Sequence, residues 1–158
     1  MRRGFTLLEL VLVLVILGVL AAVAMPRLSL TTGLEARSAA TDLVRALRGL
    51  QLYAMNGVPD LAMTVDGSGW AARDADGDQR LPGGRNEGTW PDGVAVTVSG
   101  CASGSLGFSR LGQPRCDDTL LTDPVRVRLV AGGGGQTVCL HPETGYAERR
   151  PGNASCEG

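Results

Sequence analysis

The chain has no lysine and only one histidine, His141, among its 158 residues. Its fifteen basic residues are therefore all arginines, and sixteen acidic residues bring the net charge to −1. This balance lacks the basic excess that is typical of nucleic-acid-binding domains. A single histidine leaves little room for a zinc site or for a histidine-based catalytic triad.

Aromatic residues are also scarce, at 4% of the chain, whereas the 23 glycines are abundant and lie mostly after Gly57. This composition argues against intrinsic disorder, a collagen-like repeat and a multi-span membrane protein. Roughly 100 residues follow the first helical region, enough for one small hydrophobic core. A chain of that size rarely holds a cofactor domain beside a substrate domain, so most enzymes of ordinary size are disfavoured.

The four cysteines form no C-x-x-C pair, which weakens a zinc or thioredoxin-like interpretation. All four lie in the C-terminal half, at Cys101, Cys116, Cys139 and Cys156. An even number in this arrangement predicts two disulfides and an oxidising compartment. Sequence alone does not decide among the three possible connectivities. We select Cys101–Cys116 and Cys139–Cys156, because each loop is short and begins in or beside an expected strand.

No charged residue occurs from Leu10 to Met25. As a helix, the run from Phe5 to Met25 would be about 31 Å long, which matches the hydrocarbon core of a bilayer. Arg2 and Arg3 precede the run, so the positive-inside rule keeps the N-terminus in the cytoplasm and sends the C-terminal part outward.

Two interpretations of this segment compete. In the first it is a secretory signal peptide with its cleavage site at Ala22–Ala24, which would release a soluble secreted β-domain. In the second it is retained as a membrane helix and only the leader Met1–Gly4 is lost. Glu9 favours the second interpretation, because a carboxylate in the apolar run costs about 2.5–3.5 kcal/mol near the bilayer centre and less toward its edge, and a disposable signal has no use for it. After cleavage at Gly4, the new amine of Phe5, or that of a neighbouring subunit, could neutralise Glu9.

The string Arg-Gly-Phe-Thr-Leu-Leu-Glu before an apolar run resembles the class III signal of type IV pilins and type II secretion pseudopilins. The resemblance implies that prepilin peptidase cuts after Gly4 and methylates Phe5, and that Glu9 is the assembly carboxylate. Pro26 falls where pilins often carry a helix-disrupting proline. Because Pro26 cannot donate a hydrogen bond to Ala22, we expect a kink or local melting there.

Beyond Pro26 the apolar residues recur at helical spacing up to Asn56–Gly57, a typical C-terminal stop. The expected stripe consists of Leu30, Leu34, Ala36, Ala40, Leu43, Leu47, Leu50 and Ala54. The chain is thus expected to divide into a leader (1–4), a transmembrane helix (5–28), its amphipathic continuation (29–56) and a periplasmic β-domain (57–158).

After Pro59 the period of the apolar residues changes to two. A hairpin is expected from Leu61–Asp66 and Trp70–Arg73, and Arg126 and Arg128 should face outward from a strand. The four glycines 132–135 should form a flexible hairpin tip. Six or seven short strands predict an antiparallel β-domain. A long helix followed by such a domain is the pilin layout, an α+β fold.

The stretch from Gly69-Trp70 through Asp74–Asp78 to Glu87 resembles the GspH/FimT family of minor pseudopilins and minor pilins, with Gln79 in place of an expected glycine. The resemblance implies a structural subunit rather than an enzyme: an H-type minor pseudopilin of a type II secretion system, anchored in the inner membrane and built into a periplasmic filament near its tip. Its partners would be prepilin peptidase and other pseudopilins or pilins. The alternative within this fold is a FimT-like minor pilin of a type IV pilus, involved in pilus biogenesis or DNA uptake.

Three further sets of residues are candidate sites. Asp74, Asp76 and Asp78 have the spacing of a calcium loop, but Gln79 and Arg85 stand where the loop needs glycine and glutamate, so a solvated loop is favoured. We therefore expect no cofactor and no small-molecule substrate. His141 is expected to be a strand or turn residue without a catalytic role.

The tail residues Arg149 and Arg150 raise the question of DNA binding, because some minor pilins of this family bind DNA through a Gly-Arg-x-Arg tail. This chain has Gly145 to Glu148 at that place, with Glu148 where the second arginine should be. Arg126 and Arg128 could form a small patch with Arg149 and Arg150. Few phosphate contacts follow from this arrangement, so DNA binding is expected to be weak or absent.

Overall fold

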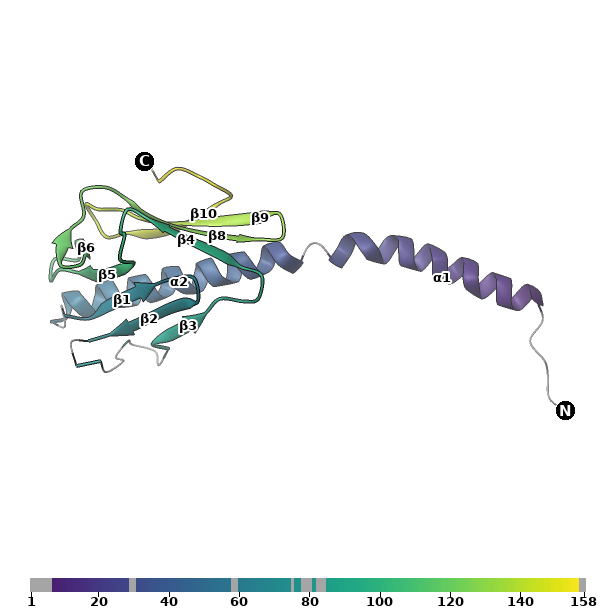
Figure 1. Cartoon of the computed structure of the whole chain (residues 1–158), viewed down its shortest axis with the longest axis horizontal. Coiled ribbons are helices and arrows are strands. Elements are labelled where there is room, and N and C mark those ends of the chain that lie inside the picture. The colour runs from purple at the N-terminus through teal and green to yellow at the C-terminus, as the bar shows by residue number, and fades with distance from the viewer. Residues whose placement is uncertain are drawn as a thin grey trace. The chain divides into compact units, whose positions relative to one another are not determined.

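The computed structural model describes residues 7–28, 31–57, 60–74, 76–77, 81 and 85–156. The chain divides into two compact units, Met1–Thr31 and Thr32–Gly158. Among these residues, the first unit contains helix α1 (Leu7–Leu28), and the second contains helix α2 (Thr31–Met55), apart from its first residue, and ten strands in two sheets (Figure 1).

Helix α1 is almost entirely apolar, and Glu9 is its acidic residue in the first turn. The backbone stays helical through Pro26 to Leu28. Of the two outcomes expected at Pro26, local melting does not occur, because the loss of one hydrogen bond does not end a helix whose other turns remain bonded. The kink at Pro26 stays a prediction. Within the residues that the structure describes, no helix has the length and the apolarity to cross a bilayer.

Helix α2 buries one stripe of side chains, as its amphipathic pattern predicts. Fully buried members of the stripe are Ala36, Ala40, Leu43, Leu47, Leu50 and Ala54. Leu34, which the sequence analysis assigned to this stripe, is 61% exposed. Its helical neighbours three and four residues further on are Arg37 and Ser38, which are both exposed, so Leu34 lies on the polar side of the helix. The helix ends before Gly57, whose φ of 102° is the left-handed conformation that glycine adopts without strain.

The first sheet, sheet A, has six antiparallel strands in the order β3-β2-β1-β5-β6-β7. Strands β1 and β2 form the predicted hairpin, with Val65 opposite Trp70. The bounds are β1 (Ala62–Val65), β2 (Gly69–Arg73), β3 (Glu87–Thr89), β5 (Ser105–Phe108), β6 (Pro114–Cys116) and β7 (Thr119–Leu120).

The second sheet, sheet B, has four antiparallel strands in the order β10-β9-β8-β4. Its strands are β4 (Ala95–Ser99), β8 (Val125–Ala131), β9 (Gly134–Leu140) and β10 (Ala147–Pro151). In β8, alternate residues are buried while Arg126 and Arg128 are exposed, as predicted. Because strand β10 contains the tail arginines, the tail is part of the sheet rather than a loose end.

The glycine run between β8 and β9 differs from the prediction. Ala131 pairs with Gly134, so only Gly132 and Gly133 form the turn, and both have positive φ, at 48° and 89°. Two consecutive residues with positive φ are the pattern of a tight type I′ turn, which glycine adopts without strain. Gly134 and Gly135 extend β9 instead of lengthening a flexible tip.

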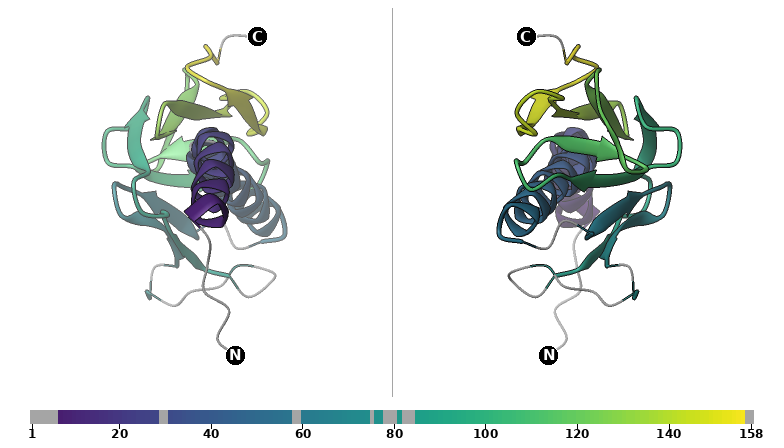
Figure 2. Two further views of the ribbon diagram at one scale, coloured as in Figure 1. Left: turned by 90° about the vertical axis from the view of Figure 1, so that its right-hand side faces the viewer. Right: turned by 90° about the vertical axis from the view of Figure 1, so that its left-hand side faces the viewer.

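Side chains from α2 and from both sheets form one continuous hydrophobic core. The largest fully buried side chain is that of Phe108, from β5 of sheet A, and it lies in the same core as Leu129 of β8 in sheet B. The end-on views in Figure 2 show strands of both sheets beside α2. Both sheets therefore pack on α2.

Candidate functional site

Glu9 lies in the first turn of α1, and its side chain is exposed. An acidic residue at this position is favoured by the helix dipole, which is positive at the N-terminus. Its described neighbours on α1, from Leu7 to Leu20, are apolar and exposed. The proposed processing residues Gly4 and Phe5 lie outside the described residues.

The residues that resemble the GspH/FimT pattern hold β2 and β3 close together. A Cβ on Gly69 would lie 2.2 Å from the carbonyl oxygen of Gly88. A Cβ on Gly88 would in turn lie 2.5 Å from the indole nitrogen of Trp70, its cross-strand partner. The two glycines therefore let the strands and the buried Trp70 ring pack closely, and Glu87 sits at the exposed end of this pairing.

Asp74 and Asp76 of the weak calcium candidate form a local turn, in which the amide of Asp76 donates to the Asp74 carboxylate at 3.2 Å. Asp78 and Gln79 lie outside the described residues. Among the residues with described positions, no group of three or more His, Cys, Asp and Glu side chains is placed to hold a metal ion.

The register of sheet B separates the two tail arginines. Arg150 shares a cross-strand row with Thr137 and Arg128, whereas Arg149 shares one with Val138 and Val127. Since Val127 is buried and Arg128 is exposed, Arg150 lies on the outer face of the sheet and Arg149 on the face toward the core. The patch expected from Arg126, Arg128, Arg149 and Arg150 therefore lacks Arg149, whose guanidinium instead donates to the side chain of Gln136.

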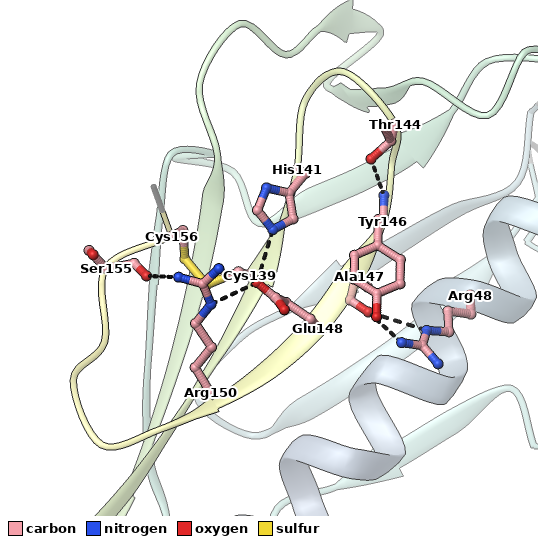
Figure 3. A network of polar contacts seen from close by, with 10 residues as sticks. All are labelled: Arg48, Cys139, His141, Thr144, Tyr146, Ala147, Glu148, Arg150, Ser155 and Cys156. Carbon is pink, nitrogen blue, oxygen red and sulfur yellow. Dashed lines mark hydrogen bonds and ion pairs between the residues drawn. A yellow bond between two sulfur atoms is a disulfide. The ribbon is translucent and has the colours of Figure 1, made fainter. Parts of the chain in front are cut away.

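A polar cluster joins the outer face of β10 to the C-terminal segment (Figure 3). The carboxylate of Glu148 contacts Nε2 of His141 at 3.1 Å and the guanidinium of Arg150 at 2.6 Å. Arg150 also donates to the carbonyl of Ser155 at 2.7 Å. The hydrogen bond from His141, and then those from Arg150, hold the pKa of Glu148 below its ordinary value despite partial burial. His141 is a turn residue whose backbone is bonded to Tyr146 and Gly145, as predicted.

The exposed side of α2 also contacts this region through two polar residues that the sequence analysis did not single out. Arg48 donates two hydrogen bonds to the carbonyl of Ala147, at 2.9 and 3.2 Å, and its guanidinium lies 5.1 Å from the centre of the Tyr146 ring. The Gln51 amide donates to the carbonyls of Gly112 and Thr144. In the sequence Arg48 belongs to the polar side of an amphipathic helix, and nothing in that pattern distinguishes it from Arg45.

Two disulfides are present, Cys101–Cys116 and Cys139–Cys156, and they are the pairs selected from the sequence. The first closes the segment that contains β5 and the turn to β6. The second fastens the C-terminal segment to the outer face of β9, where Thr137 also donates to the carbonyl of Gly152. The C-terminal segment is therefore held both by a covalent bond and by the Arg150–Ser155 contact.

Two comparisons relate the chain to known proteins, one through its N-terminal residues and one through its fold. Residues 1–25 match the family described as the prokaryotic N-terminal methylation motif. The fold is similar to that of the minor pseudopilin EpsH from the type 2 secretion system of Vibrio cholerae, with a TM-score of 0.58 at 16% identity. The chain has the pseudopilin fold. The match covers 76% of this chain and 99% of EpsH.

No curated protein matches the chain. The likeness to EpsH, together with the N-terminal motif, confirms the predicted α+β, type IV pilin-like fold and the resemblance on which it was based.

Proposed function

We propose that this protein is a structural minor pseudopilin of a type II secretion system, corresponding to the H-type subunit. The observation that supports this proposal is the conjunction of two features in one chain: a prokaryotic methylation motif over residues 1–25 and, after it, the fold of a minor pseudopilin. In this proposal the chain is an inner-membrane protein with a single transmembrane helix and a periplasmic β-domain. Prepilin peptidase removes Met1–Gly4 and methylates Phe5, and the mature subunit enters a filament with other pseudopilins.

The chemistry of the N-terminus supports a retained helix. A filament subunit that keeps α1 must place Glu9 in an apolar setting, where a lone charge is costly. The free amine that cleavage creates at Phe5 supplies the opposite charge, on the same chain or on a neighbour. A chain cleaved after Ala24 would discard Glu9 and this pairing together, which is why we place the soluble secreted β-domain behind the pseudopilin.

The proposal can be tested by intact-mass analysis of the full chain, extracted with detergent from cells that carry prepilin peptidase. We expect the mass of a chain that begins at Phe5 and carries one added methyl group. Cells with an inactive peptidase should yield the unprocessed chain. A mature protein that begins at Met25 would exclude the pseudopilin and favour the secreted β-domain.

Deletion of the gene in its native host separates the secretion system from the pilus. We expect loss of secreted enzymes from the medium with normal pilus-dependent functions, and the reverse result would favour the FimT-like minor pilin. We propose that DNA is not a partner, since Glu148 pairs with Arg150 on the outer face and Arg149 faces the core. Phosphate binding depends on several cations that face one backbone.

A further inference from the structure

Strand β4 is an unprotected sheet edge. A strand at the edge of a sheet offers unpaired backbone groups, which proteins protect by short length, charge or proline. At the other three sheet ends, β3 has three residues including Glu87, β7 has two, and β10 contains two arginines and Pro151. Strand β4 reads Ala-Val-Thr-Val-Ser, with no charge and no proline, and in the described part of the chain no strand pairs with its outer edge (Figure 1).

The core-facing side chains of β4 are incompletely covered. Val96 and Val98 lie opposite Leu129 and Val127 of β8. Those two β8 residues are 0% and 1% exposed, whereas Val96 and Val98 are only half-buried. An added strand beside β4 would cover both valines if it placed an apolar side chain on that face.

The outer face of the same edge is positively charged. Thr97 lies opposite Arg128, and Ser99 lies opposite Arg126. All four side chains are exposed, and no ion pair in the described structure includes either arginine. An added strand would lie two strand spacings from β8, about 4.8 Å each. Because Thr97 and Ser99 are short, a glutamate on the added strand and an arginine on β8 can meet above them.

We propose that the edge of β4 binds an extended segment of another protein in which acidic and apolar residues alternate. The segment adds a strand to sheet B, with its apolar residues over Val96 and Val98 and its acidic residues toward Arg126 and Arg128. A second copy of this chain fits less well, since pairing of two β4 strands would gather four arginines on one face. The inference does not depend on which secretion or pilus system the protein serves.

The test uses the full chain in detergent micelles and a labelled peptide, Thr-Glu-Val-Glu-Val-Glu-Thr, with fluorescence anisotropy as the measurement. We expect the peptide to bind at least about tenfold more tightly than its counterpart with lysine in place of glutamate. The Arg126→Glu/Arg128→Glu protein should reverse this preference. The matched control Arg73→Glu/Arg110→Glu changes the net charge equally at exposed sites outside sheet B and should leave the preference unchanged.

Backbone pairing is tested with two further peptides that carry N-methyl groups on alternate residues, one along each edge. A paired strand requires that one of them binds and that the other does not. Equal binding of both, or no saturable binding of the glutamate peptide, would overturn the proposal. So would a preference that the Arg73→Glu/Arg110→Glu control abolishes equally, because long-range charge alone would then explain it. Self-association through β4 that the peptide does not displace would overturn it in favour of a second copy.

Discussion

Helices α1 and α2 follow one another in the chain, yet they differ in the exposure of their apolar side chains. In α1 every described side chain from Leu7 to Leu20 is exposed, although nearly all of them are apolar. In α2 one stripe of apolar side chains is buried and the other side is polar or charged. The apolar stripe of the second helix is therefore part of the hydrophobic core of its own unit, whereas the described side chains of the first helix have no such core within their unit.

This difference shows where each helix obtains its stability. The buried stripe of α2 is part of the hydrophobic core, so its residues contribute to folding. A helix that is hydrophobic on all sides needs an apolar environment of its own. In the proposed function that environment is lipid before assembly and neighbouring subunits afterwards, so the residues of α1 should affect assembly and those of α2 should affect folding.

The largest expected effect is on assembly, from Glu9→Ala in α1. The variant should fold, because it makes the helix more apolar and leaves the core intact. It should be almost absent from sheared filaments, because the Phe5 amine of a neighbouring subunit loses its partner. Immunoblotting of filament and membrane fractions measures this. Glu35→Ala is the matched control on α2 and should assemble normally. Normal incorporation of Glu9→Ala would contradict the assignment of α1 to assembly and of α2 to folding.

The next effect is on folding, from a leucine-to-alanine pair. Leu47→Ala removes a fully buried side chain and should lower the free energy of unfolding by about 2–5 kcal/mol. Leu12→Ala in α1, where the side chain is exposed, should not change it. Denaturant unfolding of the full chain in micelles, followed by the fluorescence of Trp70 and Trp90, reports on the β-domain in both variants. Equal destabilisation would show that α1 also packs on the β-domain.

The disulfides should also affect folding rather than assembly, because all four cysteines belong to the unit that contains α2. Replacing Cys139 and Cys156 by alanine should cost about 3 kcal/mol, the chain-entropy value for a loop of this size. The segment after β10 should also exchange its amide hydrogens faster. Non-reducing peptide mapping of protein from the periplasmic side checks the pairing. A Cys101–Cys139 link would contradict it, and free thiols would contradict the oxidising compartment.

The sequence predicts those features that depend on periodicity. The stripe of α2, the alternation in β8 and the β1–β2 hairpin follow from spacing alone, since burial on one face imposes the period. The prediction for Leu34 is wrong because a hydrophobic residue belongs to the buried stripe only if its angle around the helix also matches. Strands β3, β6 and β7 have two or three residues, which is too short for alternation to be recognised.

The polar contacts could not be predicted, because they depend on which distant segments of the chain come together. Arg48 reaches Ala147 across 99 residues of sequence, and Gln51 reaches Gly112 across 61. The opposite orientation of Arg149 and Arg150 follows from strand geometry, but only once β10 is known to be a strand. A charged segment that ends at Pro151 gives little sign of a strand in the sequence. Its pairing with β9, which only the structure shows, fixes the direction of each side chain.

The smallest expected effect is a dependence of stability on pH, through Glu148. Its pKa is lowered in the folded protein by the hydrogen bonds from His141 and Arg150. The resulting stabilisation is fully present above the ordinary glutamate pKa of about 4.3 and is lost as the pH falls through the lower, folded value. Since the pair is partly exposed, the loss should be about 1 kcal/mol or less.

Glu148→Gln should remove this pH-dependent stabilisation, so that the variant loses less stability than the unaltered protein between about pH 5 and pH 3. Glu143→Gln, on the exposed turn nearby, is the matched control and should retain the full pH dependence. Thermal unfolding at a series of pH values measures all three proteins. Parallel pH profiles for Glu148→Gln and the unaltered protein would show that the cluster on β10 does not hold the tail, and that α2 and the disulfide suffice.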